Sequence, residues 1–134
     1  MRILIVEDDA AGRFVLQKFL EPLGDIHVAN NGEIAVQEFK TALENKRPYQ
    51  LVFLDIMLPK LDGQDALKEI RGIERKYGIK PVEASKVIMT TALSDPNNVL
   101  NAFHEGRADS YLVKPIEYAK LMQELKKIGI AVGS

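Results

Sequence analysis

The 134-residue sequence contains no cysteine, which excludes disulfide bonds and thiolate metal sites and fits a reducing compartment. No run of basic residues is longer than two and the formal net charge is −1, so the charge pattern does not point to nucleic acid or a membrane surface. No apolar run approaches a membrane span, and the first one begins too close to Met1 to leave room for a signal peptide. We therefore expect one soluble, cytoplasmic domain over residues 1–134.

Four short apolar runs each end in polar residues. Continuous apolar runs of this kind, separated by stretches with helical spacing, are typical of parallel strands buried on both faces. In an open parallel sheet, ligands bind outside the carboxyl ends of the strands. The four runs and the residues after them are Ile3–Val6 before Glu7, Asp8 and Asp9, Leu51–Leu54 before Asp55, Val87–Met89 before Thr90 and Thr91, and Ser110–Val113 before Lys114 and Pro115.

A fifth run, Ile26–Ala29, is less apolar and is typical of an edge strand. Apolar residues at helical spacing follow every strand, which indicates five strand–helix units in strict alternation. This pattern predicts an α/β fold with a five-stranded parallel sheet and helices on both faces, for which the strand order 2-1-3-4-5 is the common one. The expected helices cover residues 10–23, 32–45, 62–77, 95–106 and 117–128.

The acidic residues that follow two of the strands form a candidate metal site. Mg²⁺ prefers oxygen ligands, keeps several waters and is usually held by one or two carboxylates plus phosphate oxygens. Glu7 and Asp8 follow the first strand, and Asp55 follows the strand expected beside it. Crowded carboxylates repel one another, and a bound cation relieves that repulsion. For Asp9 alone we favour a role in capping the next helix or in contact with solvent.

Asp55 is the best candidate nucleophile, because carboxylates can form aspartyl-phosphates. Attack on phosphorus requires that the negative charge of both partners be screened, and a metal ion and an ammonium group do this. Lys114, at the end of an apolar strand, supplies the ammonium group. Thr91 supplies a hydroxyl for the same phosphoryl group. Thr90 is its competitor, since alternation along a strand places only one of the two at the site.

These residues resemble the receiver domain of two-component response regulators, in particular the stand-alone chemotaxis-regulator type. The resemblance extends from Arg2 to Ile128 and implies the flavodoxin-like, doubly wound (βα)5 fold with strand order 2-1-3-4-5. As an ordered set, the matching blocks are highly specific. They are Ile-Val-Glu-Asp-Asp at 5–9, Phe-Leu-Asp-Ile-Met-Leu-Pro at 53–59, Leu-Asp-Gly at 61–63, Met-Thr-Thr-Ala at 89–92 and Tyr-Leu-Val-Lys-Pro at 111–115.

The resemblance implies a role for each matching position around the metal. Glu7 and Asp8 correspond to the family's acidic pair, with Asp8 as the direct ligand of Mg²⁺. Asp55 corresponds to the phosphoacceptor and is itself a metal ligand. The backbone carbonyl of Met57 corresponds to the loop oxygen that completes the metal shell.

The remaining matches concern the phosphoryl group and the response to it. Thr91 corresponds to the switch hydroxyl, and Lys114 to the lysine that contacts the phosphate. Tyr111 corresponds to the aromatic residue that changes its rotamer on activation; the alternative is an ordinary aromatic at the edge of the core. The resemblance also implies that the bond before Pro115 is cis.

The implied function is that of a single-domain response regulator without an output domain, since only residues 129–134 follow the last expected helix; the alternative is a receiver excised from a longer protein. A sensor histidine kinase or a histidine phosphotransfer protein would transfer the phosphoryl group of a phosphohistidine to Asp55, with Mg²⁺ as cofactor. Phosphorylation would then bias a two-state equilibrium of the face formed by residues 95–106, 110–113 and 117–128, to which an unidentified target protein binds. The protein would be a monomer or a phosphorylation-dependent dimer. It would bind no nucleic acid and would not turn over an independent substrate.

Three alternatives compete with this interpretation. A pseudo-receiver would keep the fold as a binding module without phosphorylation, and it would have no need of the intact set of site residues. Aspartate-based phosphohydrolases typically place a second aspartate two residues after the nucleophile, where this chain has Met57. A flavin-binding protein would need a loop rich in Ser, Thr and Gly after the first strand, where Glu7, Asp8 and Asp9 would repel phosphate.

Residues 75–86 depart from the usual family pattern, because the connection between the expected helix over 62–77 and the next strand is several residues longer. The segment contains Gly78 and Pro81. It is either an extended helix end that serves as a partner surface or a tolerated loop insertion, and we favour the loop.

Overall fold

Five parallel strands form one sheet in the order β2-β1-β3-β4-β5 in the computed structural model, as the sequence predicts. The structure describes residues 1–92 and 108–132. All five residues of the central strand β3 are buried, because helices cover both of its faces, and its sequence is accordingly apolar up to its last residue. The strands are β1 (Arg2–Val6), β2 (Asp25–Ala29), β3 (Leu51–Asp55), β4 (Lys86–Thr91) and β5 (Ser110–Val113).

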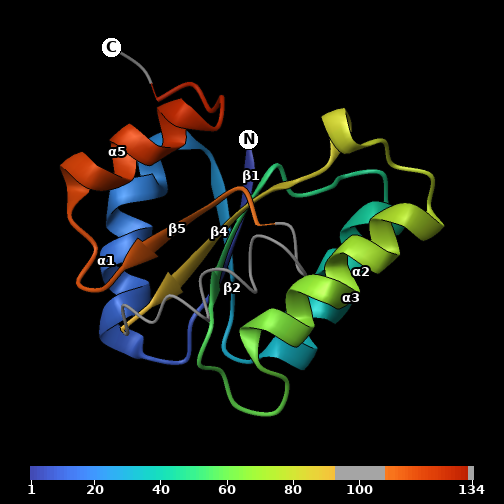
Figure 1. Ribbon diagram of the computed structural model, residues 1–134, viewed down its shortest axis with the longest axis horizontal. Helices are drawn as coiled ribbons and strands as arrows, with labels where there is room; N and C mark the ends of the chain where they lie inside the picture. Colours follow the sequence, from blue (N-terminus) through green and yellow to red (C-terminus); the bar gives the residue numbers. More distant parts are fainter. Residues whose placement is uncertain (93–107, 133–134) are drawn as a thin grey trace.

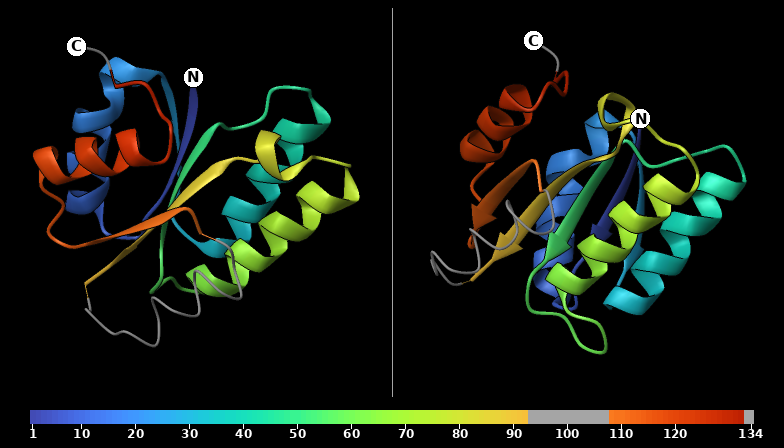
Figure 2. Two further views of the ribbon diagram at one scale, coloured as in Figure 1. Left: turned by 45° about the horizontal axis from the view of Figure 1, so that its top comes forward. Right: turned by 45° about the vertical axis from the view of Figure 1, so that its right-hand side comes forward.

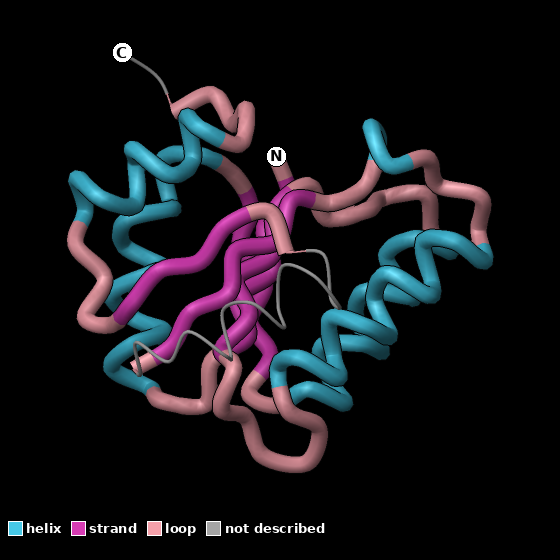
Figure 3. Tube along the Cα trace, viewed as in Figure 1, coloured by secondary structure: helices cyan, strands magenta, loops and turns pink. Residues whose placement is uncertain are grey.

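The helices lie in two layers, one on each face of the sheet. Figure 1 shows α1 (Ala10–Leu20) and α5 (Tyr118–Lys127) on one face, with α2 (Gly32–Glu44) and α3 (Gly63–Lys76) on the other, and both views of Figure 2 agree. The strands lie between these layers in the tube of Figure 3. The helix expected over 95–106 falls outside the described residues. No helix within 1–92 or 108–132 is long and apolar enough to cross a membrane.

Alternate strand residues build two separate cores. Ile3 and Ile5 pack in the core beneath α1 and α5, whereas Leu4 and Val6 pack in the core beneath α2 and α3. Such a strand buries both of its faces, which is why its residues form a continuous apolar run. The sheet is therefore rigid along its length, and polar side chains at the strand ends are held in fixed positions.

Side-chain capping and one proline define the helix ends. Asp9, Asn31 and Asp62 each cap a helix by accepting a backbone hydrogen bond of 2.9 Å from the residue three positions on, which confirms the capping role favoured for Asp9. The first helix was expected to reach residue 23, but α1 ends at Leu20 and a 3-10 turn, η1 (Glu21–Leu23), follows. Pro22 accounts for the difference, since it has no N–H with which to continue the α-helical pattern.

The long connection before β4 is a loop with one short helical turn. Helix α3 ends at Lys76, Gly78 adopts a left-handed backbone with φ of +73°, and η2 (Pro81–Glu83) is a 3-10 turn. The preference for a loop over an extended helix is therefore confirmed. Figure 1 shows this loop at the edge of the sheet where the strands begin, away from the strand ends that carry the predicted site.

Candidate functional site

Strand register brings the predicted site residues to one edge of the sheet. The strand ends and the loops that follow them lie together along the lower edge in Figure 1. Each predicted polar residue is either the last residue of a strand or the residue directly after one, and these strands are paired with one another in the sheet. Val6 pairs with Leu54, which places the next residues, Glu7 and Asp55, side by side. Asp55 in turn pairs with Thr90. Thr91 pairs with Val113, the residue directly before Lys114.

Glu7, Asp8 and Asp55 form a compact cluster of carboxylates. Their ligand oxygens all lie within 4.8 Å of one another. Glu7 and Asp55 are buried, whereas Asp8 is exposed to solvent. Buried oxygens on one side and access to water on the other suit Mg²⁺, which retains part of its hydration shell. The three side chains therefore fit the predicted metal ion.

Lys114 bridges the two buried carboxylates. Its Nζ lies 2.5 Å from Oε1 of Glu7 and 2.7 Å from Oδ2 of Asp55. Burial opposes the charge on this amine, but the hydrogen bonds to Asp55 and then Glu7 outweigh burial and raise the pKa of Lys114 above its ordinary value. The ammonium group is thus held in its charged form beside the candidate nucleophile.

One lysine does not neutralise the whole cluster. Burial, together with a hydrogen bond and repulsion from Asp55, raises the pKa of Glu7 from 4.5 to about 7, although Lys114 acts in the opposite direction. A carboxylate with a raised pKa accepts either a proton or a cation more readily than an isolated one. The site therefore carries a surplus of negative charge that a divalent cation would offset.

The loop after β3 is held tightly against the site. The backbone N–H of Met57 donates to Oδ1 of Asp55 at 3.0 Å, and the N–H of Gly63 donates to the carbonyl of Ile56 at 2.9 Å. A Cβ on Gly63 would lie 2.1 Å from the carbonyl oxygen of Asp55, so only glycine fits there. The side chain of Met57 projects into solvent. Sequence reasoning identified Met57 only through its carbonyl, and the structure adds its N–H as a contact of Asp55.

The two threonines of β4 lie on opposite faces of the sheet. Thr90 pairs with Asp55 in the register and shares its face, while Thr91 shares the other face with Tyr111, which pairs with Met89. Both threonines are buried, and the carbonyl of Thr91 accepts a hydrogen bond of 2.7 Å from the N–H of Lys114. The expectation that the two would face different ways is confirmed. The face shared by Thr91 and Tyr111 is the arrangement that the predicted switch requires.

Two further features complete the site. The peptide bond between Lys114 and Pro115 is cis, as the resemblance implied. Nη1 of Arg13 donates to the carbonyl of Glu7 at 2.9 Å and ties the start of α1 to the end of β1. Sequence reasoning missed Arg13, because an arginine in the first turn of a helix carries no signal of a contact six residues back.

The comparison with known protein families agrees with this geometry. A model of the response regulator receiver domain matches residues 3–126, which include every predicted site residue. The chain belongs to this family. No described residue contradicts the expected receiver fold, and the solved structures that resemble it share that fold.

The relatives of this receiver domain include regulators and kinases. The chain is 34% identical over 129 residues to the regulatory protein VanRB of Enterococcus faecalis, covering 96% of this chain and 52% of that protein. It is 32% identical over 133 residues to probable histidine kinase 2 of Oryza sativa subsp. indica, covering 92% of this chain and 12% of that protein. The chain thus spans about half or less of the length of these curated relatives.

Two solved structures illustrate the structural likeness. A two-component response regulator from Clostridium difficile is 30% identical with a TM-score of 0.77, over 96% of this chain and 94% of that one. The CheX–CheY–BeF3–Mg²⁺ complex from Borrelia burgdorferi contains a chain that is 27% identical with a TM-score of 0.81, over 98% of this chain and 90% of that one. That second structure was solved with Mg²⁺ and BeF3.

Proposed function

We propose that this receiver domain accepts a phosphoryl group on Asp55 from a phosphohistidine of a histidine kinase or histidine phosphotransfer protein, in a Mg²⁺-dependent reaction. The observation that carries the proposal is the position of Lys114, whose Nζ lies within 2.7 Å of both Glu7 and Asp55. An ammonium group, two further carboxylates and a backbone N–H converge on the buried Asp55. These groups suit phosphoryl transfer better than a purely structural role, because the cluster keeps negative charge that Lys114 alone does not neutralise.

The proposed reaction is a substitution at phosphorus. An oxygen of Asp55 attacks the phosphorus atom, a new P–O bond forms, and the P–N bond of the donor breaks with its electron pair going to the imidazole. Glu7, Asp8 and Asp55, with the carbonyl of Met57, would hold Mg²⁺, which supplies positive charge to the phosphoryl oxygens. Lys114 screens the remaining charge, and its raised pKa keeps it protonated throughout. No separate substrate is turned over, since the protein itself is the phosphorylated product.

The proposed output is a change in protein contacts on the face formed by β5 and α5, together with residues 95–106, which fall outside the described part. Phosphorylation adds about 1.5 to 2 negative charges and three acceptor oxygens. The hydroxyl of Thr91 then turns toward the new acceptor, and Tyr111, now partly exposed, moves into the space that is vacated. Tyr111, Val113 and Lys120 line a groove of about 520 Å³ on this face. A target protein, or a second copy of the domain, would bind there.

The direct test is intact-protein mass spectrometry after incubation with acetyl phosphate and Mg²⁺. We expect a gain of one phosphoryl group that requires Mg²⁺ and is lost in Asp55→Asn. Asp25→Asn, which removes an exposed carboxylate on the edge strand, is the matched control and should be phosphorylated like the wild type.

A pseudo-receiver would behave differently in the same experiment. If neither acetyl phosphate nor a cognate phosphohistidine donor adds mass, and if Mg²⁺ with beryllium fluoride also fails to bind, the phosphorylation proposal is wrong. If the Asp55→Asn variant still gains a phosphoryl group, a residue other than Asp55 is the acceptor.

A further inference from the structure

A second cleft lies at the opposite edge of the sheet, where the strands begin. It is enclosed by the end of α3, the loop that contains η2 and the start of β4, and its volume is about 270 Å³. The residues that decide its character are Arg71, Arg75, Ile79, Pro81, Lys86 and Asp109. None of them belongs to the phosphoryl-transfer site, because Lys86 begins the strand that Thr91 ends.

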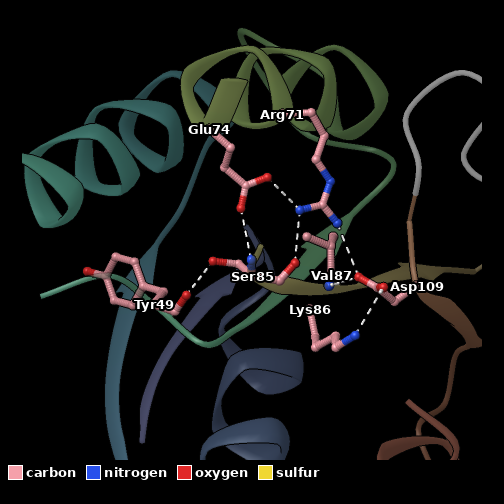
Figure 4. A network of polar contacts seen from close by, with 7 residues as sticks. All are labelled: Tyr49, Arg71, Glu74, Ser85, Lys86, Val87 and Asp109. Carbon is pink, nitrogen blue, oxygen red and sulfur yellow. Dashed lines mark hydrogen bonds and ion pairs between the residues drawn. The ribbon is translucent and has the colours of Figure 1, made fainter. Parts of the chain in front are cut away.

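The floor of this cleft is a closed network of charges, shown in Figure 4. Nη1 of Arg71 lies 2.7 Å from Oε1 of Glu74 and donates to the carbonyl of Ser85 at 2.9 Å, while Nη2 lies 3.1 Å from Oδ2 of Asp109. The N–H of Ser85 donates to Glu74 at 2.8 Å, and the N–H of Val87 donates to Asp109 at 2.7 Å. Both carboxylates are therefore already satisfied by a guanidinium and a backbone donor.

The rim of the cleft carries cations without comparable partners. The guanidinium of Arg75 makes no hydrogen bond or ion pair with any of the described residues. Nζ of Lys86 reaches only 3.9 Å from Oδ1 of Asp109, and its side chain is 38% exposed. The cleft is lined by three cationic side chains, those of Arg71, Arg75 and Lys86, and by only two carboxylates, both of which already pair with Arg71. Positive charge is therefore available at the rim. Ile79 and Pro81 add an apolar wall beside it.

We propose that this cleft binds an acidic peptide segment of a partner protein, with a carboxylate between Arg75 and Lys86 and an apolar side chain against Ile79 and Pro81. Charge complementarity selects a carboxylate, and the preformed floor lowers the ordering cost of binding. An apolar wall and only two available cations suit a short peptide better than a nucleic-acid backbone, which needs a longer track of cations. This surface goes beyond the proposed phosphorylation and lies at the other edge of the sheet.

The test is an NMR titration of the ¹⁵N-labelled protein with an acetylated, amidated peptide of sequence Glu-Leu-Asp-Glu. We expect saturable shifts of the backbone amides of Ile79, Ser85 and Lys86. The double variant Arg75→Gln, Lys86→Gln should bind about tenfold more weakly, as expected for losing charged hydrogen bonds. The control Lys76→Gln, Lys80→Gln removes two neighbouring exposed cations that do not line the cleft, and it should bind like the wild type.

Several outcomes would overturn this proposal. They are the absence of saturable shifts at millimolar peptide, equal binding of the Gln-Leu-Asn-Gln peptide, or equal weakening in the two double variants. Stronger binding of a short single-stranded oligonucleotide at the same amides would assign the cleft to phosphate instead. The spectra also report whether each variant is folded. Because the titration contains neither Mg²⁺ nor a phosphodonor, its result is independent of the proposed phosphorylation.

Discussion

The two edges of the sheet both bury charged side chains, but they balance those charges differently. At the carboxyl edge, Glu7, Asp8 and Asp55 form one cluster, in which Lys114 pairs with Glu7 and Asp55. At the amino edge, Arg71 pairs with both Glu74 and Asp109, and each of these carboxylates also accepts a hydrogen bond from a backbone N–H. The first edge has a surplus of negative charge, whereas at the second edge both carboxylates are paired with a guanidinium and a backbone donor.

This difference separates a site that needs a ligand from a network that stabilises the fold. Burying a charge is costly unless it is paired and hydrogen-bonded, so a buried surplus is a cost that the fold itself does not offset. A bound cation would offset it at the carboxyl edge. At the amino edge no such cation is needed, because Arg71 already pairs with both carboxylates. Four predictions test how the charges are balanced.

The largest effect on stability is expected at Arg71. The change Arg71→Ala leaves Glu74 and Asp109 without their guanidinium, and breaking a buried ion pair in this way costs about 3–5 kcal/mol. Urea unfolding measures the loss. The control Lys18→Ala removes an exposed pair with Glu21, in which the lysine side chain is 57% exposed, and should cost about 1 kcal/mol or less. Equal losses in the two variants would contradict the contrast.

A smaller effect is expected at Asp8, and it concerns Mg²⁺ rather than stability. Asp8→Asn removes the charge of one exposed ligand, so Mg²⁺ affinity should fall by about tenfold or more, since losing even a group that only hydrogen-bonds a metal ligand costs this much. The free energy of unfolding without Mg²⁺ should change little, since Asp8 is exposed. Isothermal titration calorimetry with MgCl2 measures the affinity. Asp25→Asn is the control, and a similar loss of affinity there would remove the assignment of Asp8.

The smallest effects concern the pH dependence of stability, measured with Mg²⁺ chelated. The pKa of Glu7 is raised to about 7 in the folded protein, so the unfolded chain loses this proton first and stability falls as the pH rises from about 4.5 to 7. Replacing Glu7 by Gln removes this loss. The variant should therefore gain stability relative to the wild type when the pH increases through that window.

Glu124 on α5 should show the opposite sign. A hydrogen bond from Ser110, followed by the effects of Lys127 and Lys120, lowers its pKa despite burial. Its contribution to stability is present above 4.5 and is lost as the pH falls through the lowered pKa. Glu124→Gln should thus cost stability at neutral pH and little in acid. Denaturation curves from acid to neutral pH check both variants, and the same sign for both would contradict the assigned environments.

Much of the fold could be predicted from local patterns. Strands buried on both faces appear as continuous apolar runs, and the capping residues Asp9 and Asp62 were visible before their helices. The end of α1 was predicted three residues late, because apolar spacing continues through Leu23 although Pro22 interrupts the hydrogen bonds. The Arg71 network could not be predicted. Glu74 lies at the i,i+3 spacing of a helical pair, but Ser85 and Asp109 lie 14 and 38 residues away, and no sequence pattern links residues across such separations.

The sequence by itself determined which residue types end each strand and therefore the chemistry available at the carboxyl edge. Alternation of apolar and polar segments is a local property, and parallel strands in this order must bring their carboxyl ends to one edge. Only the tertiary structure decided how the charges are balanced. The position of Lys114 between Glu7 and Asp55, and the contacts that Glu74 and Asp109 make at the other edge, depend on side-chain distances of 2.5 to 3.1 Å across separate elements. Packing of the whole domain sets such distances, and at that range the electrostatic energy varies steeply with each of them.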